Sequence, residues 1–104
     1  MATDHRSSAG ARVEKLIALL RAAPEHKQLE PIVEECEALS RAINAFHMEG
    51  IRFRMFNVDR ALTKGRVPVP AEAAPLFAEV RRDLEAAGFH TRSHQAPPTT
   101  TSST

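Results

Sequence analysis

Cys36 and His47 are the two side chains of this sequence that could act together as a nucleophile and its base. They stand eleven residues apart, so on one helix they would lie about 16 Å apart along its axis. One copy of the chain therefore cannot bring the thiol to the imidazole, although two antiparallel copies could. We expect Cys36 to be a core thiol and His47 to be partly buried with a hydrogen-bond partner, and neither to be catalytic.

Histidine spacing gives one further indication of chemistry, a metal site. His90 and His94 are four residues apart, which on a helix would place two imidazoles on one face. Both follow Gly88, a residue type that commonly ends helices, so we expect them in a polar tail instead. The single cysteine excludes an internal disulfide and a cysteine-rich zinc module. The sequence predicts neither a metal nor a cofactor.

The segment Ala45-Phe46-His47-Met48-Glu49-Gly50 resembles the centre of histidine phosphotransfer domains, which are small helical bundles. The resemblance covers these six residues and implies that His47 accepts a phosphoryl group. That family usually has Lys and then Gly after the histidine, with the glycine four residues on. In this chain Gly50 comes one residue early, and Glu49 would repel a phosphoryl group. Phosphotransfer is therefore a remote alternative.

A basic segment over residues 51–66 interleaves phenylalanine with arginine and lysine. Such a segment could bind nucleic acid, with cations on phosphates and aromatic rings on bases. Around a helix, however, Arg52, Arg54 and Arg60 do not share one face, which disfavours a recognition helix. The segment therefore favours contact with a protein, and a nucleic-acid-binding accessory or regulatory protein is the alternative.

Charge is segregated along the chain on either side of Gly50. Residues 25–49 have a net charge of −4 and residues 50–66 a net charge of +4. If both lie on one long helix, two copies packed antiparallel near Gly50 would bring opposite charges together. The sequence thus favours a homodimer with close backbone approach at Gly50. The alternative is two solvated faces, with Gly50 merely breaking the helix.

The elements that would position these residues are helices. Apolar residues recur at helical spacing over 9–22, over a long stretch of 31–62, and again up to Ala87. Ser8 is the expected cap of the first helix, and Pro70 or Pro75 begins the last. The sequence predicts an all-α fold: a helical hairpin with a long central helix and a third packing helix, completed as a dimeric bundle.

The apolar stripe of the long central helix shifts by about 90° after Gly50, so the helix must kink or change its packing partner there. Residues 51–58 also alternate well enough to form a strand, which leaves an α+β fold as the alternative. At the end of the last helix, Gly88 and Phe89 have the types of a Schellman cap, with Phe89 packing on Leu84.

Composition bounds the whole chain. The 104 residues suffice for one small domain, expected over 9–90, between a disordered 1–8 and a disordered Thr/Ser/Pro-rich tail at 91–104. A net charge of +1 disfavours a histone-like protein, and the eleven Arg against three Lys are typical of a GC-rich bacterial genome. No apolar run could span a membrane, and no secretory signal is visible, so a cytoplasmic location is expected.

We therefore expect a small cytoplasmic interaction or adaptor protein, a homodimer that is not an enzyme, acting on a further protein through its helix faces. The expected contact residues flank the charge boundary: Phe46, Gly50, Arg52, Phe53, Arg54, Phe56, Arg60 and Lys64.

Overall fold

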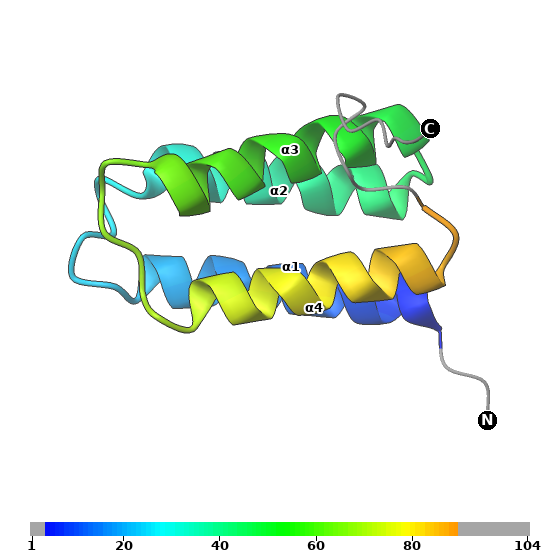
Figure 1. The fold of residues 1–104 in the computed structure, drawn as a ribbon, viewed down its shortest axis with the longest axis horizontal. Helices are drawn as coiled ribbons and strands as arrows, with labels where there is room; N and C mark the ends of the chain where they lie inside the picture. The colour runs from blue at the N-terminus through cyan, green and yellow to red at the C-terminus, as the bar shows by residue number, and fades with distance from the viewer. Residues whose placement is uncertain (1–3, 90–104) are drawn as a thin grey trace, which may run out of the picture.

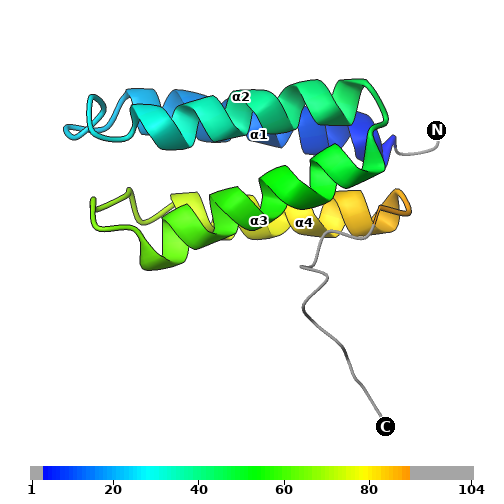
Figure 2. The same ribbon diagram turned by 90° about the horizontal axis from the view of Figure 1, so that it is seen from above.

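The computed structural model describes residues 4–89, which form four α-helices. They are α1 (His5–Arg21), α2 (Glu30–Asn44), α3 (Met48–Lys64) and α4 (Ala73–Ala86). Each helix runs antiparallel to the one before it, and α2 beside α3 forms a layer over α1 beside α4 (Figures 1 and 2). The predicted all-α fold is confirmed. Residues 51–58 are helical, so the strand alternative is wrong.

One apolar stripe from each helix builds a shared core. The predicted helical spacing is confirmed, because the buried residues of each helix recur at intervals of three and four positions. All four helices contribute residues with no exposed surface, which include Val13, Leu16 and Leu20 of α1, Val33, Cys36 and Leu39 of α2, Ile51, Met55 and Val58 of α3, and Val80 and Leu84 of α4.

The first helix begins earlier than predicted. The expected cap Ser8 is wrong, because Asp4 is the N-cap and its carboxylate accepts hydrogen bonds from the Ser7 N–H at 3.1 Å and the Ser7 hydroxyl at 2.8 Å. These hydrogen bonds, the hydroxyl first, lower the pKa of Asp4. Residues 5–8 are thus helical where disorder was predicted, while residues 1–3, His90 and the tail at 91–104, which includes His94, lie outside the described residues.

The predicted long central helix is wrong, since α2 ends at Asn44 and α3 begins at Met48. The chain reverses through Ala45, Phe46 and His47, with Phe46 in the left-handed region at φ 57°. The reversal lets the two apolar stripes, which point about 90° apart on a continuous helix, face the same core. The stripe shift after Gly50 was therefore the signature of two helices.

The C-terminal end of α4 agrees with its prediction. Gly88 has φ 97°, the Phe89 N–H donates to the Leu84 carbonyl at 2.9 Å, and the Gly88 N–H donates to the Glu85 carbonyl at 3.0 Å. This hydrogen-bond pair is a Schellman motif. Phe89 is buried and belongs to the core cluster.

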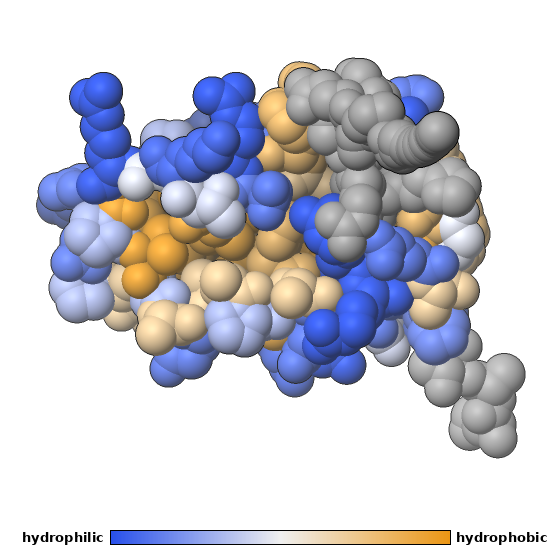
Figure 3. Space-filling view, viewed as in Figure 1, coloured by the Kyte–Doolittle hydropathy of each residue, from blue (hydrophilic) through white to orange (hydrophobic). Residues whose placement is uncertain are grey.

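The four helix pairs are packed unequally. Helix α1 packs closely on α4 and α2, and α2 on α3, whereas α3 and α4 make the fewest contacts. Arg81 of α4 and Asp59 of α3 approach to 3.8 Å across this looser seam. Apolar surface is visible between α3 and α4 toward the loop that joins them, where Leu62, Val67 and Val69 are partly buried (Figure 3). Among residues 4–89, no helix has the length and apolarity to span a membrane.

Candidate functional site

Gly50 has a structural role in the chain reversal between α2 and α3. His47 is the N-cap of α3, and its Nδ1 accepts the Gly50 N–H at 2.8 Å. A Cβ at position 50 would lie 2.7 Å from that Nδ1 and 3.3 Å from the Ala42 Cβ, so glycine is needed for the close approach of the two helices. The predicted crossing of two long helices at Gly50 is wrong, because the close approach is made within one chain.

Phe46 lies in the turn between α2 and α3, at one end of the bundle. The residue is 63% exposed, and the Arg6 guanidinium lies over its ring, 3.7 Å from the ring centroid. The ring of Phe89 is 6.2 Å away, centroid to centroid. Arg6 also donates to the Ile43 carbonyl at 3.1 Å, which satisfies the C-terminal end of α2. This cluster therefore ties the start of α1 to the turn.

Helices α2 and α3 form the layer that faces the viewer in Figure 2. Several expected contact residues of α3 recur three or four positions apart and are exposed or partly exposed, on the side of the helix away from the core. Phe53 is 54% exposed, although it is a large aromatic residue. The Arg54 guanidinium lies 5.0 Å from the Phe53 centroid, and the Arg60 guanidinium 5.8 Å from that of Phe56. Lys64 follows one turn after Arg60 and is exposed.

We call this surface the outer hairpin face. Its residues recur every three or four positions along each helix, which is the spacing of a single helix face. Sequence reasoning missed the contribution of α2, although that spacing was present as a signal. The face comprises Glu30, Glu34, Ala38, Arg41 and Ala45 from α2 and its cap, and Glu49, Phe53, Phe56, Arg60 and Lys64 from α3.

The acidic and basic segments meet inside one chain. Arg54 of α3 donates to the Glu35 carboxylate of α2 at 2.9 Å, and the Asn57 amide donates to the same oxygen at 3.1 Å. Contacts between α2 and α3 of one chain therefore neutralise part of the opposite charge that, in the sequence, favoured a homodimer. Arg54 is consequently neutralised, whereas Arg60 and Lys64 make no ion pair with any of the described residues.

Arg52 is separate from the outer hairpin face. It lies two turns before Asp59, on the side of α3 that faces α4, and its side chain is mostly buried. Its Nε is buried without a hydrogen-bond partner, and its guanidinium is 3.9 Å from the Glu49 carboxylate. Arg52 is therefore not accessible as the contact residue that the sequence predicted.

A shallow groove of about 280 Å³ runs beside the outer hairpin face, between α2 and α3. Its apolar lining comes from Pro31, Ile32 and Ala61, and its polar rim includes Asn57 and Arg60. The Arg60 cation therefore stands at the edge of apolar surface, a combination that suits a protein contact.

Cys36 and His47 do not form a reactive pair. Cys36 is fully buried, and burial, with the nearby Glu35 and Glu37 carboxylates, raises the pKa of its thiol to about 12. His47 is exposed, contrary to the predicted partial burial, but its predicted hydrogen-bond partner exists as the Gly50 N–H. The thiol is thus protonated and shielded at neutral pH.

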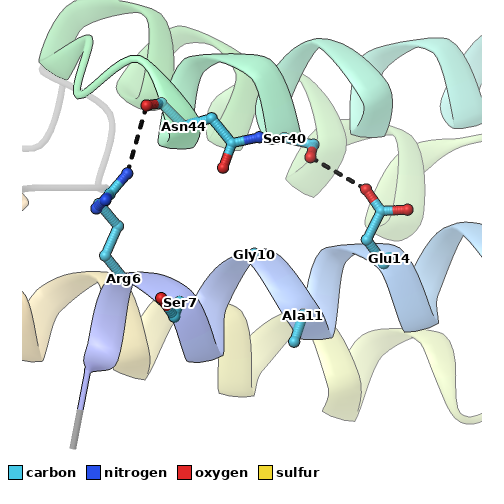
Figure 4. Close-up of a pocket in the computed structure, with 7 residues that line it drawn as sticks. All are labelled: Arg6, Ser7, Gly10, Ala11, Glu14, Ser40 and Asn44. Atoms are coloured by element: carbon cyan, nitrogen blue, oxygen red, sulfur yellow. Dashed lines mark hydrogen bonds between the residues drawn. The ribbon is translucent and has the colours of Figure 1, made fainter.

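A second groove, of about 250 Å³, separates α1 from α2 and was not foreseen from the sequence. Gly10 and Ala11 leave it open, while Arg6 reaches the Asn44 carbonyl at 3.4 Å and Ser40 donates to Glu14 at 3.1 Å across it (Figure 4). These polar contacts bridge the two helices across the groove.

No protein-family model, curated protein or solved structure matches the chain. Within residues 4–89, no three His, Cys, Asp or Glu side chains are grouped so that they could hold a metal ion. His90 and His94 lie outside that range. The outer hairpin face, which exposes Phe53 beside Arg60 and Lys64, is the best candidate for a functional site.

Proposed function

We propose that this chain is a small protein-interaction or adaptor module that binds through the outer hairpin face. The observation that carries the proposal is Phe53, a large aromatic side chain that is 54% exposed in the middle of α3. Aromatic and arginine residues contribute most to protein interfaces when a partner covers them. The cations Arg60 and Lys64 beside it are unpaired among the described residues, which gives the surface polar specificity.

A cytoplasmic site of action is part of this proposal. It is supported by the single cysteine, whose free thiol is buried in the core, as is common for proteins of reducing compartments. The proposal assigns no catalytic role to this thiol, because a pKa of about 12 keeps it protonated.

A photo-crosslinking residue placed at position 53 of the full chain tests the proposal in the native cells. The matched control carries the same residue at Arg82, which is exposed on α4. We expect a protease-sensitive, nuclease-resistant adduct from position 53 and none from position 82. Equal adducts from both positions, or none from position 53, would contradict the proposal.

Nucleic-acid binding is the second candidate, favoured by the guanidinium groups over the rings of Phe53 and Phe56. A single strand could stack bases on these rings and place phosphates on Arg60 and Lys64. Fluorescence anisotropy with a mixed-sequence oligonucleotide separates the two candidates. If the chain binds nucleic acid, the affinity for the oligonucleotide must fall steeply as the salt concentration rises. It must also fall in the Phe53→Ala variant.

The phosphotransfer alternative has no support from the surroundings of His47. Its Nδ1 is engaged by the Gly50 N–H at 2.8 Å, and Glu49 is placed in the first turn of α3. A carboxylate close to the imidazole disfavours a transferred phosphoryl group.

A further inference from the structure

The outer hairpin face has a fixed register between its two helices. Glu35 contacts Arg54, and Ala42 lies against Gly50, so antiparallel neighbours can be read off step by step along α2 and α3. Continuing this register, Ala38 stands level with Phe53 to within about one residue, or about 1.5 Å. In the same way Arg41 stands level with Glu49, and Glu30 with Arg60.

Most charged side chains at the two edges of this face make no ion pair within the part of the chain that the structure describes. Glu30, Glu34, Arg41 and Arg60 form no ion pair with any of residues 4–89. Among these residues Glu49 approaches Arg52, at 3.9 Å, and its side chain remains 76% exposed. Each edge therefore carries charge that a second surface could neutralise.

Two copies could be related by a two-fold axis parallel to the helices. This rotation places α2 of one copy over α3 of the other, and the two helices run antiparallel. Each residue keeps its position along the axis, so residues that are level within one hairpin are also level between the two copies. The edge that carries Arg41 then meets the edge that carries Glu49, and Arg60 meets Glu30 and Glu34. By symmetry each contact occurs twice. In the opposite arrangement, α2 would lie on α2 of the second copy. Like charges would then repel, because each α2 carries one basic residue, Arg41, and four acidic residues: Glu30, Glu34, Glu35 and Glu37.

The centre of the face fits the same arrangement by shape. Phe53 is exposed on α3, whereas the level position on α2 is Ala38, with Ala42 one turn and Ala45 two turns further along. An exposed aromatic ring would thus lie on small side chains of the second copy, which allows close packing.

We infer that the outer hairpin face binds a second copy of this chain, paired with α2 on α3 by Arg41–Glu49 and Arg60–Glu30 contacts. This inference rests on the proposed function, since it names the occupant of the same surface. It replaces the long-helix crossing at Gly50 with a pairing of two complete hairpins.

Cysteine crosslinking tests the pairing directly, because the native Cys36 is buried and silent. The double variant R41C/E49C places thiols on opposite edges of one hairpin, so a short bis-maleimide can join them only between two copies. We expect covalent dimers from R41C/E49C and from an equimolar mixture of the two single variants. Neither single variant alone should give a dimer, and the off-register control R41C/R60C should give none.

Charge reversal provides a second readout in solution. Arg41→Glu should weaken the dimer about tenfold, because symmetry places two like-charge contacts in each dimer. Adding Glu49→Arg should restore most of the affinity, and Arg82→Glu on α4 should leave it unchanged. Sedimentation equilibrium measures all four proteins.

The outcomes separate this inference from the proposed function. A wild-type chain that stays monomeric at millimolar concentration, or a dimer that crosslinks equally through R41C/R60C, overturns the self-pairing. If such a monomer still gives a position-53 adduct with a different polypeptide, the proposed function stands and only the self-pairing fails. A nuclease-sensitive adduct overturns both.

Discussion

The imidazole Nδ1 of His47 accepts the backbone N–H of Gly50 at 2.8 Å, and this hydrogen bond fixes the start of α3. Helix N-termini leave N–H groups without partners, and a side-chain acceptor at the cap satisfies one of them. The same contact orients α3 against α2, because Gly50 also lies against Ala42.

His47→Ala should lower the free energy of unfolding by about 1 kcal/mol, the usual value of a lost N-cap. His47→Asn should restore most of this loss, since an amide oxygen can accept the same N–H. Urea unfolding followed by circular dichroism measures both variants. A His47→Ala protein as stable as the wild type would show that the imidazole contributes no cap.

Gly50→Ala and Gly10→Ala should change stability in opposite directions. A Cβ at Gly50 would press on the His47 ring at 2.7 Å and on Ala42 at 3.3 Å, whereas a Cβ at Gly10 would meet nothing within 4 Å. Gly10→Ala should stabilise the protein by about 0.5–1 kcal/mol through helix propensity. Gly50→Ala should destabilise it, and equal gains in melting temperature for both variants would refute the close approach.

The sequence predicted the core better than the connections. Helical spacing identified the buried residues Val13, Leu39 and Val80, and residue type identified the cap at Gly88. The turn after Asn44 was missed because it contains neither glycine nor proline, and because histidine is not a common N-cap. Tertiary packing decides this turn, since only a reversal brings both apolar stripes to one core.

The candidate site was partly predictable for the same reason. Phe53, Arg60 and Lys64 were expected contact residues, and the structure leaves them accessible on one face. The charge pattern indicated that acidic and basic helices pair, but it could not distinguish pairing within a chain from pairing between copies. The Arg54–Glu35 contact shows pairing within the chain, and Arg52 is withdrawn by its position beside α4.

The Cys36 thiol should be inert in the folded protein. Because its pKa is raised to about 12, the protonated form persists at pH 8, and burial also blocks access by reagents. A chromogenic disulfide reagent should therefore label Cys36 at pH 8 only at the rate of unfolding. Addition of urea should make labelling rapid, and rapid labelling of the native protein would contradict the packing of α2.

Asp4 should raise the free energy of unfolding by an amount that decreases at acid pH. Its pKa in the folded protein is lowered, first by the Ser7 hydroxyl and then by the Ser7 N–H, so its contribution is present above about pH 3.8. That contribution is lost as the pH falls through the lowered folded pKa. The stability difference between wild type and Asp4→Ala should shrink across this acid range, whereas a constant difference would exclude an ionised cap.

Binding of a second copy to the outer hairpin face should be visible in amide NMR spectra of the full chain on dilution. Spectra taken from millimolar to low micromolar concentration should show shifts for Ala38, Arg41, Glu49 and Phe53. Exposed positions on the opposite layer, such as Lys15 and Arg82, should stay unchanged and serve as internal controls. Spectra that do not change with concentration, or changes confined to α1 and α4, would contradict the account.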